Sequence, residues 1–323
     1  MTPGLAGLIA SGIDQRAWDE SVAGALEALS TAFGVIPDRS GKPAACRRTW
    51  LDTFDWRLHR AGLTLEYAGR PRGGELLLTG DTASTPSTAS APSSANAANG
   101  ANAADSPATA VTSQPVIGWQ AARPHLMCEL PDGPVASRIG DLVAPRALLP
   151  VVTVTSKTTT HRLLNEDGKT VARLLIEWAS VPGPQPTPLA PRLWITEVRG
   201  YPGAARTAAR LLGAVPGIEP ATAPTETEAL RAVGRRPGDY SNKIDADITA
   251  AQPASQAAAT ILLRLLDTIE ANIAGVLADT DTEFLHDLRV SVRRTRSALK
   301  LFGDALTGRA GGRPRAALLF PWA

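Results

Sequence analysis

One histidine and four cations recur at helical spacing near the end of the chain, and their types suit them to bind an anion. They are His286, Arg289, Arg293, Arg296 and Lys300. At about 100° per residue, positions three and four apart fall on one side of a helix, so these side chains should form a single stripe. An arginine fork can hold two phosphate oxygens at once, and histidine can donate to another. The spacing therefore predicts a surface that binds a polyanion.

The positive charge of the chain is concentrated around this stripe. The formal net charge is only +2, but residues 284–315 hold eight Arg and Lys side chains against Asp287 and Asp304. An ordinary solvated helix face is also polar, but it usually mixes signs, because opposite charges stabilise a helix and like charges repel. Nucleic acid is a less suitable partner, since no aromatic residue interleaves the stripe to stack on bases. A phosphate polymer fits the pattern better.

The same region also carries an apolar pattern that predicts a helical hairpin. A long helix is expected after Pro253, and Thr280 with Glu283 marks the start of a second one. In the second helix the expected core-facing residues are Leu285, Leu288, Val292, Thr295, Leu299 and Phe302. The cationic stripe lies beside this apolar one.

The run from Phe284 to Phe302 (FLHDLRVSVRRTRSALKLF) resembles the signature of CHAD domains, the conserved-histidine α-helical domains. This resemblance implies a helical bundle that is associated with inorganic polyphosphate. It also implies that His286, Arg289, Arg293 and Arg296 occupy the family's anion-contacting positions. It covers residues 251–306 and not the tail at 307–323, whose Gly and Pro content predicts an irregular, truncated end. The unfinished bundle would leave a surface for helix-mediated association.

A second resemblance lies near the start of the chain. Residues 49–58 (TWLDTFDWRL) and 61–65 (AGLTL) resemble a block of CYTH domains, which often precede CHAD domains in one chain. The resemblance implies that residues 1–250 form an antiparallel β-tunnel. Active members of that family hydrolyse triphosphates, with acidic residues holding Mg²⁺ or Mn²⁺ and basic residues holding phosphate.

The acidic residues of that family are largely missing here. The expected Glu-x-Glu-x-Lys strand has no counterpart in residues 1–12, which contain no charged residue, and the later acidic pair is reduced to Glu197. We therefore expect no catalytic residue, no bound cofactor, and only Glu197 as a weak metal-ligand candidate. Basic residues that could remain from a phosphate-binding tunnel are Lys157, Arg162, Arg199 and Lys243.

These observations leave three hypotheses for the function. The first is a non-catalytic polyphosphate-binding protein. The second is a metal-dependent triphosphatase that uses Mg²⁺ or Mn²⁺ and recruits Glu66, Glu129 or Glu197 in place of the missing strand. The third is an inactive fragment of a larger protein.

The elements that would position these residues predict an α+β fold. A helix is expected over 14–35, followed by strands at 49–53, 63–67 and 75–79. Residues 81–115 are almost entirely small and polar, which predicts a disordered insertion. Further strands are expected at 116–119, 125–130, 151–156, 171–179 and 193–199, with a hairpin turn at 165–168. Helices are expected over 204–212 and from the capping pair Thr225 and Glu228 to Gly234.

The composition indicates a cytoplasmic protein. Two cysteines cannot form a disulfide framework, and residues 1–12 lack the basic leader of a signal peptide. No apolar run is long enough to span a membrane, so no membrane partner is expected.

Overall fold

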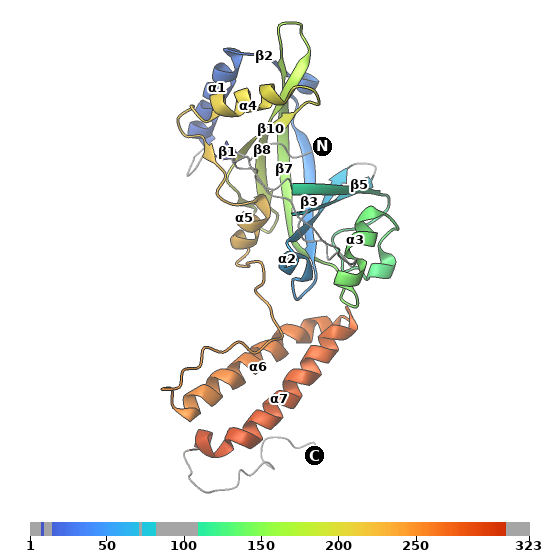
Figure 1. Cartoon of the computed structure of the whole chain (residues 1–323), viewed down its shortest axis with the longest axis vertical. Helices are drawn as coiled ribbons and strands as arrows, with labels where there is room; N and C mark the ends of the chain where they lie inside the picture. The colour runs from blue at the N-terminus through green and yellow to red at the C-terminus, as the bar shows by residue number, and fades with distance from the viewer. Residues whose placement is uncertain (1–7, 10–14, 71–72, 82–108, 308–323) are drawn as a thin grey trace, which may run out of the picture.

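The computed structural model describes residues 8–9, 15–70, 73–81 and 109–307 (Figure 1). The strands are β1 (Leu8–Ile9), β2 (Gly34–Pro37), β3 (Ala44–Asp52), β4 (Leu63–Arg70), β5 (Gly73–Asp81), β6 (Thr109–Val116), β7 (Leu149–Leu164), β8 (Thr170–Val181), β9 (Thr187–Pro188), β10 (Arg192–Glu197) and β11 (Glu219–Pro220). The α-helices are α1 (Gln15–Ser30), α2 (Arg57–Arg60), α3 (Pro134–Val143), α4 (Pro202–Leu212), α5 (Thr225–Ala232), α6 (Ala254–Leu277) and α7 (Thr282–Thr307).

The strands form one curled antiparallel sheet. Its order is β11-β1-β10-β8-β7-β3-β4-β5-β6, with β2 paired to β7 and β9 paired to β8. The long strand β7 lies at its centre, pairs with β3 and β8, and turns back into β8 at residues 165–168, as the sequence predicts. The α6–α7 hairpin extends from one end of this sheet domain (Figure 1). The expected α+β fold, an antiparallel sheet followed by a helical hairpin, is confirmed.

Helices cover the outer face of the sheet in two places. Near β8 and β10, α1 and α4 pack on a core that includes Trp18, Leu174 and Leu193. Near β4 and β5, α3 packs on a second core that includes Leu65 and Leu76. On the inner face, α5 packs against β7 and β8, and its first turn lines a cavity on that face.

Four predictions of secondary structure are wrong. The strand expected at 116–119 is absent, because β6 ends at Val116. Residues 109–115, assigned to the disordered insertion, belong to β6, because their backbone pairs with β5; residues 82–108 lie outside the described part of the chain. The predicted strand at 125–130 is an isolated bridge at His125 followed by a 3-10 turn over Met127–Glu129. The expected helix over 14–35 ends at Ser30, where the chain turns into β2.

The hairpin packs closely where α6 ends and α7 begins. A Cβ atom on Gly275 would lie 2.2 Å from the Phe284 ring, so only glycine lets this ring seat against α6. Among the described side chains of α7, the buried ones are Phe284, Asp287, Ser291 and Ala298. Leu285, expected in the core, is 38% exposed. The buried stripe is thus rotated by about one residue from the expected one, because two polar side chains, Asp287 and Ser291, occupy the packed face.

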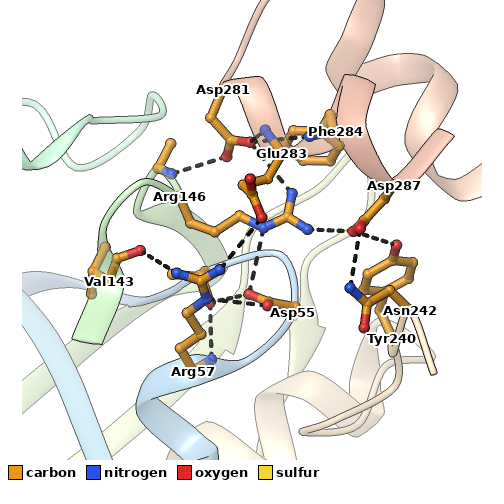
Figure 2. Close-up of polar contacts among 12 residues, drawn as sticks. Asp55, Arg57, Val143, Arg146, Tyr240, Asn242, Asp281, Glu283, Phe284 and Asp287 are labelled. Carbon is orange, nitrogen blue, oxygen red and sulfur yellow. Dashed lines mark hydrogen bonds and ion pairs between the residues drawn. The ribbon is translucent and has the colours of Figure 1, made fainter. Parts of the chain in front are cut away.

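A buried arginine joins the sheet domain to the hairpin (Figure 2). Arg146, in the loop after α3, is 1% exposed and lies between three carboxylates. Its Nη1 donates to Asp281 over 3.3 Å, its Nη2 donates to Asp287, and its Nε lies 3.7 Å from Asp55. The guanidinium also lies 5.2 Å from the centre of the Phe284 ring. Buried charges are stable only when they are paired in this way.

The residues of the CYTH-like block build the sheet side of this junction. Asp52 accepts hydrogen bonds from the backbone N–H groups of Thr53, Leu58 and His59 and so fixes the short helix α2. Asp55 accepts from the Thr53 hydroxyl and from Arg57. Burial opposes ionisation of Asp55, but the Thr53 hydrogen bond and the charges of Arg146 and Arg57 outweigh it and keep its pKa below the ordinary value.

Asp281 caps α7, where the sequence suggested Thr280. Its Oδ1 accepts from the backbone N–H groups of Glu283 and Phe284, and its Oδ2 accepts from Ala147. The other predicted capping pair is also wrong. Thr225 makes no capping hydrogen bond, and Glu228 instead binds the backbone of Ala190 and the side chain of Arg192.

We expect Asp281→Ala to lower the free energy of unfolding by about 2–4 kcal/mol, because it removes a helix cap and one partner of a buried arginine. Urea denaturation measures the change. Thr280→Ala is the matched control and should change stability by less than about 0.5 kcal/mol. Equal effects of the two substitutions would contradict this assignment of the cap.

Candidate functional site

The predicted cationic stripe lies on α7, and all five of its side chains are exposed. Two of them, His286 and Arg293, line a pocket of about 580 Å³ at the start of the helix. Arg289, Arg296 and Lys300 lie outside this pocket and continue the stripe along α7. The stripe therefore begins in a concave site and extends over an open surface.

The opposite wall of the pocket comes from the segment that links α5 to α6. Asn242, Lys243 and Ile244 line it, together with Arg294 of α7. We call this the junction pocket, lined by Asn242–Ile244, His286, Asp287, Val290, Ser291, Arg293 and Arg294. The structure thus brings Lys243, predicted as a tunnel remnant, beside His286 and Arg293. Lys243, Arg293 and Arg294 give the pocket three formal positive charges.

The one carboxylate that lines the junction pocket is already engaged by donors. Asp287 is 3% exposed and accepts hydrogen bonds from Arg146, from the Tyr240 hydroxyl at 3.1 Å and from Asn242 at 3.0 Å. Tyr240 in turn accepts from Asn272 of α6 over 2.7 Å. The ring of Tyr240 also contacts Phe54. These contacts hold the linker, and hence Lys243, against α7.

Sequence reasoning missed two contributors to this pocket. Arg294 falls on the solvated side of the helix in a projection of α7 alone, but the linker passes beside it. Asn242 directly precedes Lys243 in the linker between α5 and α6. Only tertiary hydrogen bonds, from Tyr240 and Asn242 to Asp287, show that this linker meets α7.

A second cavity, of about 640 Å³, lies on the inner face of the sheet. Side chains from β3 to β8, from β10 and from the first turn of α5 line it, among them Trp50 and Trp194. Arg48 lies in it between Glu66, at 3.8 Å, and Glu177, at 3.1 Å. The Nη2 atom of Arg48 is close to Glu177 but off the geometry of a hydrogen bond, so the contact is an ion pair only.

The carboxylates of this cavity are buried or already paired with other groups. Burial raises the pKa of Glu66. Burial, together with the charges of Asp52 and Glu66, raises the pKa of Glu226 to about 7. Glu177 accepts from the Trp194 indole over 3.0 Å. Among the described residues, no group of three or more His, Cys, Asp or Glu side chains is arranged to hold a metal ion.

Comparisons with known proteins bear on the C-terminal part. Residues 260–318 match the CHAD domain. The match confirms the resemblance read from residues 284–302. It also includes most of the tail from Thr307 onward, which the sequence analysis left out: glycine and proline argue against a continuing helix but do not exclude similarity to the family. No curated protein matches the chain.

Two solved structures resemble the chain distantly. One is a candidate adenylate cyclase from Bacillus halodurans, at 13% identity and a TM-score of 0.41, covering 66% of this chain and 90% of that one. The other is a candidate adenylyl cyclase from Hippeastrum, described as having a dominant triphosphatase activity. It has 11% identity and a TM-score of 0.40, covering 73% of this chain and 98% of that one. At these scores neither structure informs the function of this chain.

The remaining predicted residues do not gather at one site. Lys157 is exposed and faces away from the cavity, since its neighbours Ser156 and Thr158 line it. Arg162 shares the cavity face of β7 but lies further along the strand, opposite Arg173. Arg199 and Glu197 are exposed beside the end of β10.

Of the three acids named for the triphosphatase hypothesis, only Glu66 lines the cavity. Glu129 is paired with Arg123 over 3.2 Å, and Glu197 is exposed. No helix among the described residues is both long and apolar enough to cross a membrane.

The raised pKa of Glu226 predicts a pH dependence of stability. The folded-state value of about 7 lies above the ordinary value of 4.5, so the folded chain retains a proton that the unfolded chain loses between these values. The free energy of unfolding therefore falls as the pH rises through this window. Glu226→Gln should stabilise the protein by about 1–2 kcal/mol more at pH 8 than at pH 5, allowing for partial exposure.

Urea denaturation at the two pH values measures this difference. Glu27→Gln, on the exposed side of α1, is the control. It should change the free energy of unfolding by the same amount at both pH values. The same stabilisation by Glu226→Gln at pH 5 and pH 8 would rule the interpretation out.

Proposed function

We propose that this protein binds inorganic polyphosphate at the junction pocket and along the adjoining face of α7, without hydrolysing it. The observation that carries the proposal is the meeting of Lys243, His286, Arg293 and Arg294 in one pocket whose single acid is already paired. Donors aimed at one concave space with little competing negative charge suit phosphate oxygens.

The stripe beyond the pocket favours a polymer over a single phosphate. Arg289, Arg296 and Lys300 continue from the pocket along the exposed side of α7. From His286 to Lys300 the helix rises about 21 Å. A linear anion can contact this whole length, whereas a small anion can occupy only the pocket. The match of residues 260–318 to the CHAD domain agrees with this location of the site.

The proposal includes a reducing, cytoplasmic location. Cys46 and Cys128 form no disulfide, which fits such a compartment.

The first test removes the predicted contacts. We expect His286→Ala, Arg289→Ala and Arg293→Ala together to weaken polyphosphate binding at least about 100-fold, because charge-assisted hydrogen bonds to phosphate are lost. Titration calorimetry with long-chain polyphosphate measures the affinity. The control replaces Arg16, Lys169 and Arg210, three exposed cations of the sheet domain, by Ala. Equal losses in both variants would mean that only net charge matters, and unchanged affinity in the first would refute the proposal.

Salt should weaken the binding steeply. Each phosphate neutralised by the protein releases bound counterions, so log K should fall linearly with log salt, by analogy with single-stranded nucleic acid at about 0.7 per contact. Titrations between 50 and 300 mM salt, on the order of the range used for nucleic acid, measure the slope. The wild type should have a slope steeper than the triple variant by about two. A slope near zero would contradict binding through the cationic stripe.

The alternative function is a metal-dependent triphosphatase in the inner-face cavity. The observation that favours it is the presence of Arg48, Glu66, Glu177 and Glu226 on one cavity. Phosphate release from tripolyphosphate, with added Mg²⁺ or Mn²⁺, separates the two functions. We expect no release above background. Release that Glu66→Gln abolishes would replace our proposal by the alternative.

A further inference from the structure

The junction pocket contains a negative charge that would oppose anion binding if it were not compensated. Asp287 follows His286 directly and lines the pocket with His286 and Arg293. It is 3% exposed, so water screens it little. Its Tyr240 and Asn242 partners are neutral donors. Among the described residues, the one cation paired with Asp287 is Arg146.

Arg146 does not belong to the helical hairpin. It lies in the loop between α3 and β7 of the sheet domain and reaches across the junction to α7 (Figure 2). Two of its three carboxylate partners, Asp55 and Asp281, have a second source of positive charge in Arg57 and the N-terminus of α7, whereas Asp287 has only neutral donors besides Arg146. Asp281 accepts from backbone N–H groups at the start of α7, and Asp55 accepts from Arg57 and Thr53. Asp287 therefore depends on Arg146 more than the other two do.

We infer that the sheet domain sets the anion affinity of the α7 site, because its Arg146 compensates the negative charge of Asp287. Arg146 is a positioning residue here: it does not line the junction pocket, and it acts on the ligand only through Asp287. Without its charge, the carboxylate would repel phosphate and would compete for the cations of the pocket. The inference rests on the proposed function, because it concerns the same site.

The contacts of Asp287 add a geometric consequence. Through Tyr240 and Asn242 the same carboxylate anchors the linker that carries Lys243. A carboxylate that is ionised and paired with Arg146 can accept all of these hydrogen bonds at once. Arg146 thus compensates the charge of Asp287 and, through Asp287, helps to hold the linker that forms the second wall of the pocket.

The test uses the full chain and long-chain polyphosphate as the probe. Arg146→Met, of similar length but neutral, should weaken binding about tenfold. Methionine cannot neutralise Asp287, so one unit of negative charge remains close to the site. Adding Asp287→Asn to this variant should return the affinity to within about threefold of the wild type. A role for Arg146 in packing alone predicts no such rescue.

Arg57→Met is the matched control. Arg57 crosses the same junction and contacts Asp55, Glu283 and the carbonyl groups of Val143 and Ala144, but it does not touch Asp287. Its loss weakens the junction without changing the charge beside the pocket. We expect Arg57→Met to bind polyphosphate within about twofold of the wild type.

The possible outcomes separate the inference from the function on which it rests. No binding by the wild type, or no loss in the His286, Arg289 and Arg293 variant, overturns the proposed function. Binding that depends on those residues but is unchanged by Arg146→Met overturns the inference alone, as does a loss that Asp287→Asn fails to rescue. If Arg146→Met does not fold, Asp287→Asn is compared with the double variant. Affinities within about threefold support the inference, and a larger gap overturns it.

Discussion

The arrangement of this protein depends on the burial of one arginine between two parts of the chain. Arg146 comes from the sheet domain, and two of its three carboxylate partners, Asp281 and Asp287, come from the hairpin. A charge at 1% exposure is stable only if its partners are present, so this contact favours the observed meeting of the sheet domain and the hairpin. The same guanidinium contacts Asp281, which caps α7, and the ring of Phe284.

Residues of the block that resembles CYTH domains lie at the same junction. Asp52, Thr53, Asp55 and Arg57 surround the junction and satisfy backbone or charged groups there. Their role in this structure is to shape a loop that receives the hairpin. The inner face of the sheet lines a cavity whose charged groups are largely paired with one another. The exposed cations of the junction pocket lie on the other side of the junction.

The sequence predicted the elements that have a strong period and failed where tertiary contacts decide. The helices around Ile261 and Arg293, and the β7–β8 hairpin with its turn at Gly168, follow from apolar spacing and turn chemistry. Residues 109–115 look like a linker by composition, yet they form a strand because β5 offers an edge to pair with. A helix projection could not show that Asp287 is buried rather than solvated. Its partners, Arg146 and Tyr240, lie 141 and 47 residues away in sequence.

The cationic stripe itself was predictable, but the pocket was not. Lys243 was recognised as a possible remnant of a tunnel and His286 as part of the cationic stripe, and only the folded linker places them together. The most direct test of this composite site is hydrogen–deuterium exchange of the full chain with and without long-chain polyphosphate. The account predicts that polyphosphate slows exchange in residues 240–244 and 286–294 together. Slower exchange confined to the inner-face strands β3, β4 and β10 would contradict it.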